Sequence, residues 1–258
     1  MKTVLLAAAL AFGVAGAALA NEGVELPSQD WPQAGPFGRL DMKAARRGFQ
    51  VYKEVCSGCH SISLASYRNL RGIGFTEDQV KAIAAEVQVS DGPNDQGEMF
   101  QRPGRASDRF VKPFPNDQAA RAANGGALPP DLSVVVKARH GGEDYITGLL
   151  VGYEETPPAG VTLADGKYYN KYFPGHQIGM PKMLNDDGID YADKTDGAGK
   201  TVKPTALQQA MDVSVFLSYI AEPSQDQRKN LGIRVMIFLA IFTGLMFACK
   251  KKVWRDVH

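Results

Sequence analysis

The sequence has only three cysteines in 258 residues, and this scarcity excludes a disulfide scaffold. An excess of one charge is also missing, because 29 Lys and Arg stand against 28 Asp and Glu. A whole-chain surface suited to a phosphate backbone is therefore absent, and nucleic acid is not expected as a partner. With 44% hydrophobic, 22% charged and 9% aromatic residues, the chain is neither disordered nor a many-span membrane protein.

The N-terminus has the pattern of an export signal. Lys2 precedes an apolar run from Val4 to Leu19, which ends in the small-x-small triplet closed by Ala20. Signal peptidase cleaves after such triplets, so residues 1–20 are predicted to be a signal peptide. The mature chain then begins at Asn21, outside the cytoplasmic membrane.

The C-terminal region is predicted to cross a membrane once. An uncharged run extends from Val235 to Cys249, and Arg234 lies at its edge, where its long stem can reach the headgroups. Three lysines follow this run directly, as expected on the cytoplasmic side. We expect an exported domain at 21–227, an anchor at 228–250 and a cytoplasmic tail at 251–258. The exported domain carries 21 basic and 27 acidic residues, so it would attract a basic soluble partner.

The chemistry is concentrated in residues 56–60, which read Cys-Ser-Gly-Cys-His. This is the attachment motif of c-type haem: Cys56 and Cys59 can add to two vinyl groups of one porphyrin, and His60 then ligates the iron. A redox Cys-x-x-Cys pair or half of a zinc site are the competing interpretations. Neither requires the histidine, and a second cysteine pair for zinc is missing.

Two helices are predicted beside this motif. The first is amphipathic, covers residues 42–55, and places Gly48, Tyr52 and Cys56 on one face. The second covers residues 205–221 near the C-terminus. The pair resembles class I cytochromes c, in which a glycine of the first helix lets an aromatic side chain of the last helix pack closely.

A six-coordinate haem needs a second axial ligand. The candidates after His60 are Met99, His140, His176, Met180, Met183 and Met211. Met180 stands between a glycine and a proline, a context that holds an irregular strap against an iron. Met183 is its competitor, because spacing alone does not reject it. A methionine opposite histidine raises the reduction potential, which suits electron transfer to another c-type cytochrome.

A long insert separates His60 from Met180. Ten of the 15 prolines fall between Pro93 and Pro181, so most of the insert is expected to be extended loop over the haem. Helices are predicted at residues 76–89, opened by a capping box at Thr76, and at residues 132–139 and 146–151.

Several blocks together resemble the cytochrome c1 family. They read Arg-Gly-Phe-Gln-Val-Tyr at 47–52, Asp-Gly-Pro-Asn at 91–94, Ala-Leu-Pro-Pro-Asp-Leu-Ser at 127–133 and Arg-His-Gly-Gly-Glu-Asp-Tyr at 139–145. Further blocks at 172–180 and 221–223 extend the match over nearly all of residues 39–255. The resemblance implies a mainly α, class I cytochrome c-like haem domain with long loop insertions and one C-terminal transmembrane helix.

The resemblance also implies roles for single residues around one covalent haem c. Met180 would be the distal iron ligand opposite His60. Arg139 and Tyr145 would hydrogen-bond the haem propionates, and Asn124 and Pro130 would line the haem edge. The chain departs from the family pattern after Met180, where it reads Pro-Lys-Met.

The implied function is electron transfer in a membrane quinol–cytochrome c oxidoreductase, the bc1 complex. The protein would be a subunit of this enzyme and would carry out no bond chemistry of its own. It would take an electron from a Rieske iron–sulfur protein and pass it to a soluble cytochrome c. The implied partners are the cytochrome b subunit, that Rieske protein and the lipid membrane, in a dimeric complex of the bacterial inner membrane with the haem domain in the periplasm. The rivals are a free-standing anchored carrier, the cytochrome c subunit of a terminal oxidase, and a haem-based periplasmic sensor or assembly protein, which would need an open coordination site.

Overall fold

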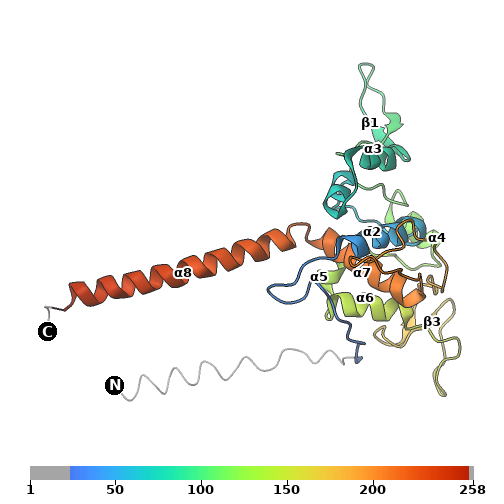
Figure 1. Cartoon of the computed structure of the whole chain (residues 1–258). Helices are drawn as coiled ribbons and strands as arrows, with labels where there is room; N and C mark the ends of the chain where they lie inside the picture. The colour runs from blue at the N-terminus through green and yellow to red at the C-terminus, as the bar shows by residue number, and fades with distance from the viewer. Residues whose placement is uncertain (1–23, 256–258) are drawn as a thin grey trace, which may run out of the picture.

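The computed structural model describes residues 24–255. The predicted signal peptide and the predicted start at Asn21 lie outside these residues, as do residues 256–258 of the predicted tail. In the described part, the chain forms a mainly helical domain from which one long helix projects (Figure 1). The predicted class, mainly α with a C-terminal apolar helix, is confirmed.

The elements are short except for the last two helices. In chain order they are α2 (Met42–Val51), the π-helix η1 (Tyr52–Cys56), the 3-10 helix η2 (Tyr67–Ile73), α3 (Glu77–Ala85), β1 (Gln88–Asp91), β2 (Phe100–Pro103), α4 (Asp117–Ala123), α5 (Val135–Ala138), α6 (Gly142–Val151), β3 (Tyr168–Tyr169), β4 (Gln177–Ile178), α7 (Ala206–Ala221) and α8 (Gln225–Val253).

The core forms where α2 and α7 cross (Figure 1). Gly48 makes this crossing possible, because a Cβ there would stand 1.9 Å from the carbonyl oxygen of Asp212 and 2.8 Å from Cβ of Phe216. The predicted contact between a glycine of the first helix and an aromatic residue of the last is confirmed. Phe216 also packs against Phe49 and Tyr52, with ring centroids 5.6 and 5.7 Å apart, so the start of the haem motif rests on the core.

The helix starts follow from their capping residues. Asp41 and Thr205 accept hydrogen bonds from backbone N–H groups in the first turns of α2 and α7, which satisfies donors that the helix leaves free. The predicted capping box at Thr76 is confirmed, since its side chain and that of Gln79 bond reciprocally to the backbone.

Several predicted boundaries are wrong. The expected helix at 76–89 ends at Ala85, because the carbonyl of Val87 accepts from Gly104 and the chain continues into β1. The helix expected at 132–139 is only Val135–Ala138, since Asp131 holds the residues before it in a turn. The helix expected at 146–151 begins earlier, at Gly142.

The insert between the two predicted ligands has more regular structure than its prolines suggested. Helix α4 forms within it, capped by Asn116. Strands β1 and β2 pair antiparallel, with Gln88 opposite Pro103 and Asp91 opposite Phe100. This hairpin projects away from the α2–α7 core, so the expectation of extended loop over the haem is wrong for this stretch (Figure 1).

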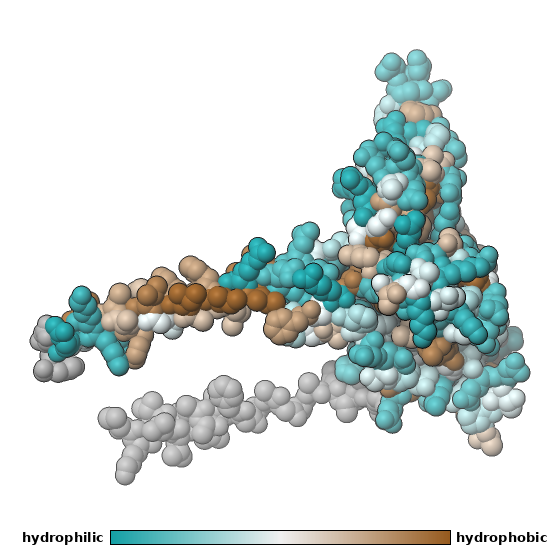
Figure 2. Space-filling view, viewed as in Figure 1, coloured by the Kyte–Doolittle hydropathy of each residue, from teal (hydrophilic) through white to brown (hydrophobic). Residues whose placement is uncertain are grey.

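Helix α8 is apolar along its middle and carries polar residues at both ends (Figure 2). Among the described residues it is the one helix long and apolar enough to cross a membrane, and none of its side chains is buried in the domain. Its apolar surface therefore needs a cover outside the domain, and a bilayer provides one.

Candidate haem site

The attachment motif lies in a widened turn at the end of the first helix. The predicted continuous helix at 42–55 changes to a π-helix at Tyr52, and the carbonyl of Tyr52 accepts from the N–H of Ser57 at 2.8 Å. The N–H of His60 then donates to the carbonyl of Cys56 at 2.9 Å. This turn brings the two cysteines and the histidine close together in a compact unit, as addition to one porphyrin requires. Widened π turns recur at functional sites.

The ring of His60 is oriented by the segment around Pro130. Its Nδ1 lies 2.8 Å from the carbonyl oxygen of Pro130, so Nδ1 carries the proton and donates. The other ring nitrogen, Nε2, keeps a free lone pair. Burial lowers the pKa of His60, an effect that the Pro130 carbonyl partly offsets, and this direction favours the neutral imidazole that iron ligation requires.

Asp131 holds this segment against the haem motif. Its carboxylate accepts hydrogen bonds from the Ser61 hydroxyl at 2.7 Å and from the N–H groups of Ser63 and Ser133 at 2.9 and 2.8 Å. Burial alone would raise the pKa of Asp131, but these hydrogen bonds hold it well below its ordinary value. Asp131 is thus a positioning residue for Pro130, a role the sequence analysis did not assign to it.

A buried ion pair fixes the helix that carries the motif. The guanidinium of Arg47 donates two hydrogen bonds of 2.8 Å to the two carboxylate oxygens of Asp212, and both side chains are almost fully buried. Sequence analysis missed this pair. A signal was present, because Asp212 is a charged residue in the middle of the largely apolar helix α7, and a buried charge needs a partner.

Met180 follows strand β4 in a short strap, defined here as residues 177–183. Strands β3 and β4 pair antiparallel, with Tyr168 opposite Ile178. The hydroxyl of Tyr153 donates to the carbonyl oxygen of Met180 at 2.9 Å, so it fixes the backbone that carries the predicted ligand. Met180 is half-buried, whereas Met183 is 40% exposed. Of the two candidates, Met180 therefore has the more enclosed environment.

The loop at residues 124–131 contacts both predicted ligand segments. Pro130 holds the His60 ring, as described, and a Cβ on Gly179 would lie 3.1 Å from Cβ of Ala127. The predicted residue Asn124 closes the preceding helix, its side-chain amide donating to the carbonyl of Ala120 at 2.7 Å. One loop thus connects the segment of His60 with the segment of Met180.

The two predicted propionate donors lie together. Arg139 ends α5, and Tyr145 lies in the first turns of α6. Burial raises the pKa of Tyr145, and the neighbouring guanidinium of Arg139 partly counteracts this. A guanidinium beside a phenol is a suitable pair for an anionic carboxylate.

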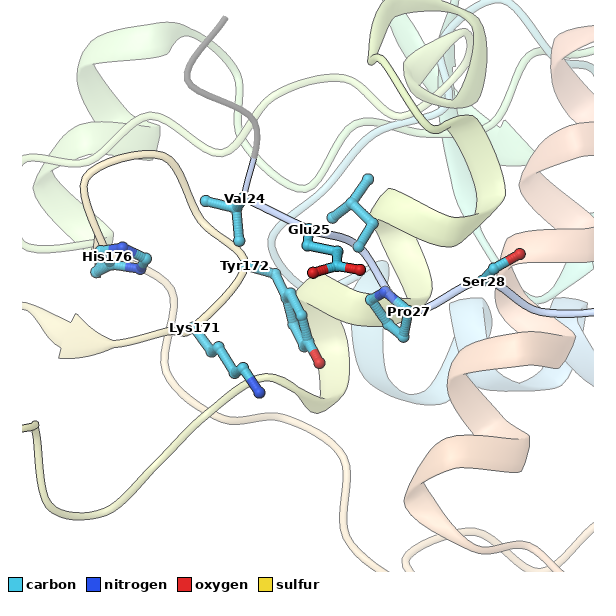
Figure 3. A pocket seen from close by; sticks show the side chains of 8 residues that line it. Val24, Glu25, Pro27, Ser28, Lys171, Tyr172 and His176 are labelled. Atoms are coloured by element: carbon cyan, nitrogen blue, oxygen red, sulfur yellow. The ribbon is translucent and has the colours of Figure 1, made fainter.

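A cavity lies apart from these residues. It has a volume of about 610 Å³ and opens between the N-terminal segment and the loop of residues 171–176 (Figure 3). Glu25, Lys171, Tyr172 and His176 are among the residues lining it. The predicted iron ligands and haem cysteines do not line this cavity.

The donor set fits a c-type haem. Two thiols one turn apart, an adjacent imidazole with its Nδ1 engaged, and a thioether on a strap whose backbone Tyr153 holds match what the cofactor requires. No cluster of three or more His, Cys, Asp or Glu suited to a metal ion occurs among residues 24–255, so the zinc interpretation has no complete ligand set in this part.

Comparisons with known proteins agree with this assignment. The model of the "Cytochrome C1 family" matches residues 31–257. The chain is 46% identical to "Cytochrome c1" of Rhodospirillum rubrum, covering 100% of this chain and 98% of that protein. It is 51% identical to "Cytochrome c1-2, heme protein, mitochondrial" of Solanum tuberosum, covering 88% of this chain and 85% of that protein.

A longer relative also matches. The chain is 48% identical to "Cytochrome b/c1" of Bradyrhizobium diazoefficiens, over 98% of this chain but only 39% of that protein. It thus spans about two-fifths of that relative's length. The chain belongs to the cytochrome c1 family, whose members carry a covalently bound haem c and serve in respiratory electron transport.

Proposed function

We propose that this protein is the haem-bearing electron-transfer subunit of a quinol–cytochrome c oxidoreductase, the bc1 complex. The carrying observation is the attachment motif with the His60 ring held by Pro130, on a chain that also has a helix long and apolar enough to cross a membrane. Family membership supports the complex, and one relative is named "Cytochrome b/c1". Bound haem supplies one-electron redox chemistry. The chain supplies Cys56 and Cys59 as attachment points and His60 and Met180 as iron ligands.

The proposed electron path begins at a Rieske iron–sulfur protein and ends at a soluble cytochrome c. The cytochrome b subunit and the Rieske protein are the proposed neighbours in a dimeric assembly. Residues 21–227 carry 27 acidic and 21 basic residues, which favours encounter with a basic acceptor. Arg139 and Tyr145 are proposed to hold the haem propionates, and Asn124 and Pro130 to line the haem edge.

The proposed arrangement in the membrane follows from the two ends of the chain. Residues 1–20 direct export and are removed, residues 21–227 lie in the periplasm, and residues 228–250 cross the membrane. The tail at 251–258 is cytoplasmic, in accord with the lysines at 250–252.

Spectra of the native assembly test the complex. The chain is tagged and purified gently from solubilised membranes. One sample is reduced with ascorbate and a second sample with quinol, and reduced-minus-oxidised spectra are recorded for each. We expect b-type haem bands to copurify and quinol to reduce the c-type haem. A c-type haem alone, left oxidised by quinol although the protein is intact, would instead indicate a free-standing anchored carrier.

Leucine variants test the iron ligand. We expect Met180→Leu to abolish the near-infrared absorption of the methionine–iron bond, and the matched control Met183→Leu to keep it. Survival of that absorption in Met180→Leu would overturn the assignment. Tyr153 and the enclosed position of Met180 support the expected outcome.

A further inference from the structure

The chain before α2 is fixed to the first turns of the anchor helix α8. Nζ of Lys229 donates hydrogen bonds to the carbonyl oxygens of Gln33 and Gly38, at 2.5 and 3.2 Å. The carboxylate of Asp226 accepts from the backbone N–H of Leu40 at 3.3 Å. The segment from Gln33 to Leu40 is therefore held in a fixed position against α8.

This segment exposes an aromatic side chain beside a small charged cavity. We name Pro36–Arg39 the interface loop; Phe37, within it, is 78% exposed. A cavity of about 150 Å³ lies between the loop and α8, lined by Pro36, Phe37, Gly38, Arg39, Asp226, Lys229, Asn230 and Ile233. Two cationic side chains face one carboxylate in its wall, so the cavity has a net positive charge.

The length of the apolar run sets where the bilayer begins. The uncharged run from Val235 to Cys249 has 15 residues, whereas a hydrocarbon core of about 30 Å needs roughly 20 helical residues. The three preceding apolar positions, 231–233, must therefore enter the boundary of the bilayer, with Arg234 reaching back to the headgroups. Ile233 is one of these positions and also lines the cavity, so the cavity lies at the level of the headgroups.

We propose that the interface loop is a second membrane contact of this protein. Phe37 enters the boundary between headgroups and acyl chains of a phospholipid on the domain side of the membrane. The cavity beside it takes the headgroup, with Arg39 donating to the phosphate. The proposal concerns membrane seating and is independent of the electron-transfer partners proposed above.

The observations favour a lipid over a protein partner. The cavity is too small for a helix or strand, but its size suits a headgroup. Two of the three N–H donors of Lys229 already bond backbone carbonyls, whereas Arg39 makes no side-chain hydrogen bond within residues 24–255. A guanidinium with free donors pairs well with phosphate oxygens. The contact is also continuous with α8, because Asp226, Lys229 and Ile233 of that helix line the cavity.

Photocrosslinking in native membranes tests this contact. Phe37 is replaced by benzoylphenylalanine in the full-length holoprotein, a change that an exposed aromatic position tolerates. Phe242, exposed on α8, is the positive control, and Met99, exposed on the distant hairpin, is the negative control. After irradiation, mass spectrometry identifies what is attached to each labelled peptide. We expect phospholipid adducts at positions 37 and 242, at least fivefold above the yield at position 99.

Two results would overturn the contact. One is an adduct at position 37 with another polypeptide, which would make the loop a protein interface. The other is no adduct at 37 while position 242 reacts, which would place Phe37 in water. The headgroup contact is tested by Arg39→Gln. We expect this variant to lower the yield of lipid adduct at position 37 at least twofold and to leave the yield at position 242 unchanged. An unchanged ratio would overturn the role of Arg39.

Discussion

The two sides of the haem site are built differently. The His60 side rests on α2, which crosses α7 through Gly48 and is held by the buried Arg47–Asp212 pair. The Met180 side rests on two strands of two residues each and on a few side-chain hydrogen bonds, made by Tyr153 and Gln177. Damage on the first side should therefore unfold the domain, whereas damage on the second should change the iron ligation of a folded domain.

The largest effect is expected from breaking the buried ion pair. Arg47→Met leaves the carboxylate of Asp212 buried without its cation, and we expect the free energy of unfolding to fall by about 3–5 kcal/mol. Denaturant titration of the detergent-solubilised holoprotein, followed by far-ultraviolet circular dichroism, measures this. The double variant Arg47→Met, Asp212→Leu should recover most of the loss, because both charges are then removed.

An exposed ion pair provides the matched control. Nζ of Lys53 lies 2.6 Å from Oε2 of Glu86, and both side chains are about half exposed. Lys53→Met should change the free energy of unfolding by less than about 1 kcal/mol. Equal effects of Lys53→Met and Arg47→Met would show that burial of the pair does not stabilise the His60 side.

The helix crossing is the next most sensitive point. In Gly48→Ala the new Cβ would meet backbone atoms of Asp212, which cannot move away without separating the helices. We expect a loss of about 1–3 kcal/mol, measured by the same titration, although alanine alone favours a helix. Gly197→Ala is the control, because its Cβ meets nothing within 4 Å. An unchanged stability in Gly48→Ala would contradict the close crossing.

Sequence alone predicted the parts of this protein that local patterns encode. The attachment motif, the capping box at Thr76 and the helix ending at Ala221 all depend on residues close together in the chain. The capping box and the helix ending at Ala221 are confirmed in the structure. The glycine at position 48 predicted a close helix contact correctly, since only a small residue permits one.

The missed features depend on contacts between distant residues. Tyr153 and Met180 are 27 positions apart, and Arg47 and Asp212 are 165 apart, so no local pattern pairs them. The hairpin at 88–103 was missed because it is closed by a backbone hydrogen bond from Gly104 to Val87, two residues far apart in the sequence. Tertiary contacts override local propensity at such places.

Acid should weaken the His60 side through Asp131. Its folded pKa lies below its ordinary value, so its contribution to stability is complete above that ordinary value and is lost as the pH falls through the folded pKa. Asp108 and Glu222 contribute to stability in the same way, because ion pairs lower the pKa of each to about 2. We therefore expect the free energy of unfolding to fall between about pH 5 and pH 2.

The variant Asp131→Asn isolates one part of that acid effect. Its amide cannot carry the charge that three donors stabilise, so we expect a loss of about 1–2 kcal/mol at pH 7. Its stability should also depend less on pH between 5 and 2 than that of the unchanged protein. Parallel pH profiles of the two proteins would exclude Asp131 as the source.

The smallest effect is expected on the Met180 side. Tyr153→Phe removes one hydrogen bond to the Met180 carbonyl, worth about 1 kcal/mol, so the ratio of methionine-bound to methionine-free iron should fall about fivefold. Warming or raising the pH should then bleach the near-infrared methionine–iron band earlier, while the denaturation midpoint barely moves. Tyr168→Phe, at the half-exposed neighbour on β3, should leave the band unchanged. If Tyr153→Phe instead lowered the denaturation midpoint as Gly48→Ala does and spared the band, the strap would belong to the core, and the two sides would not differ as described.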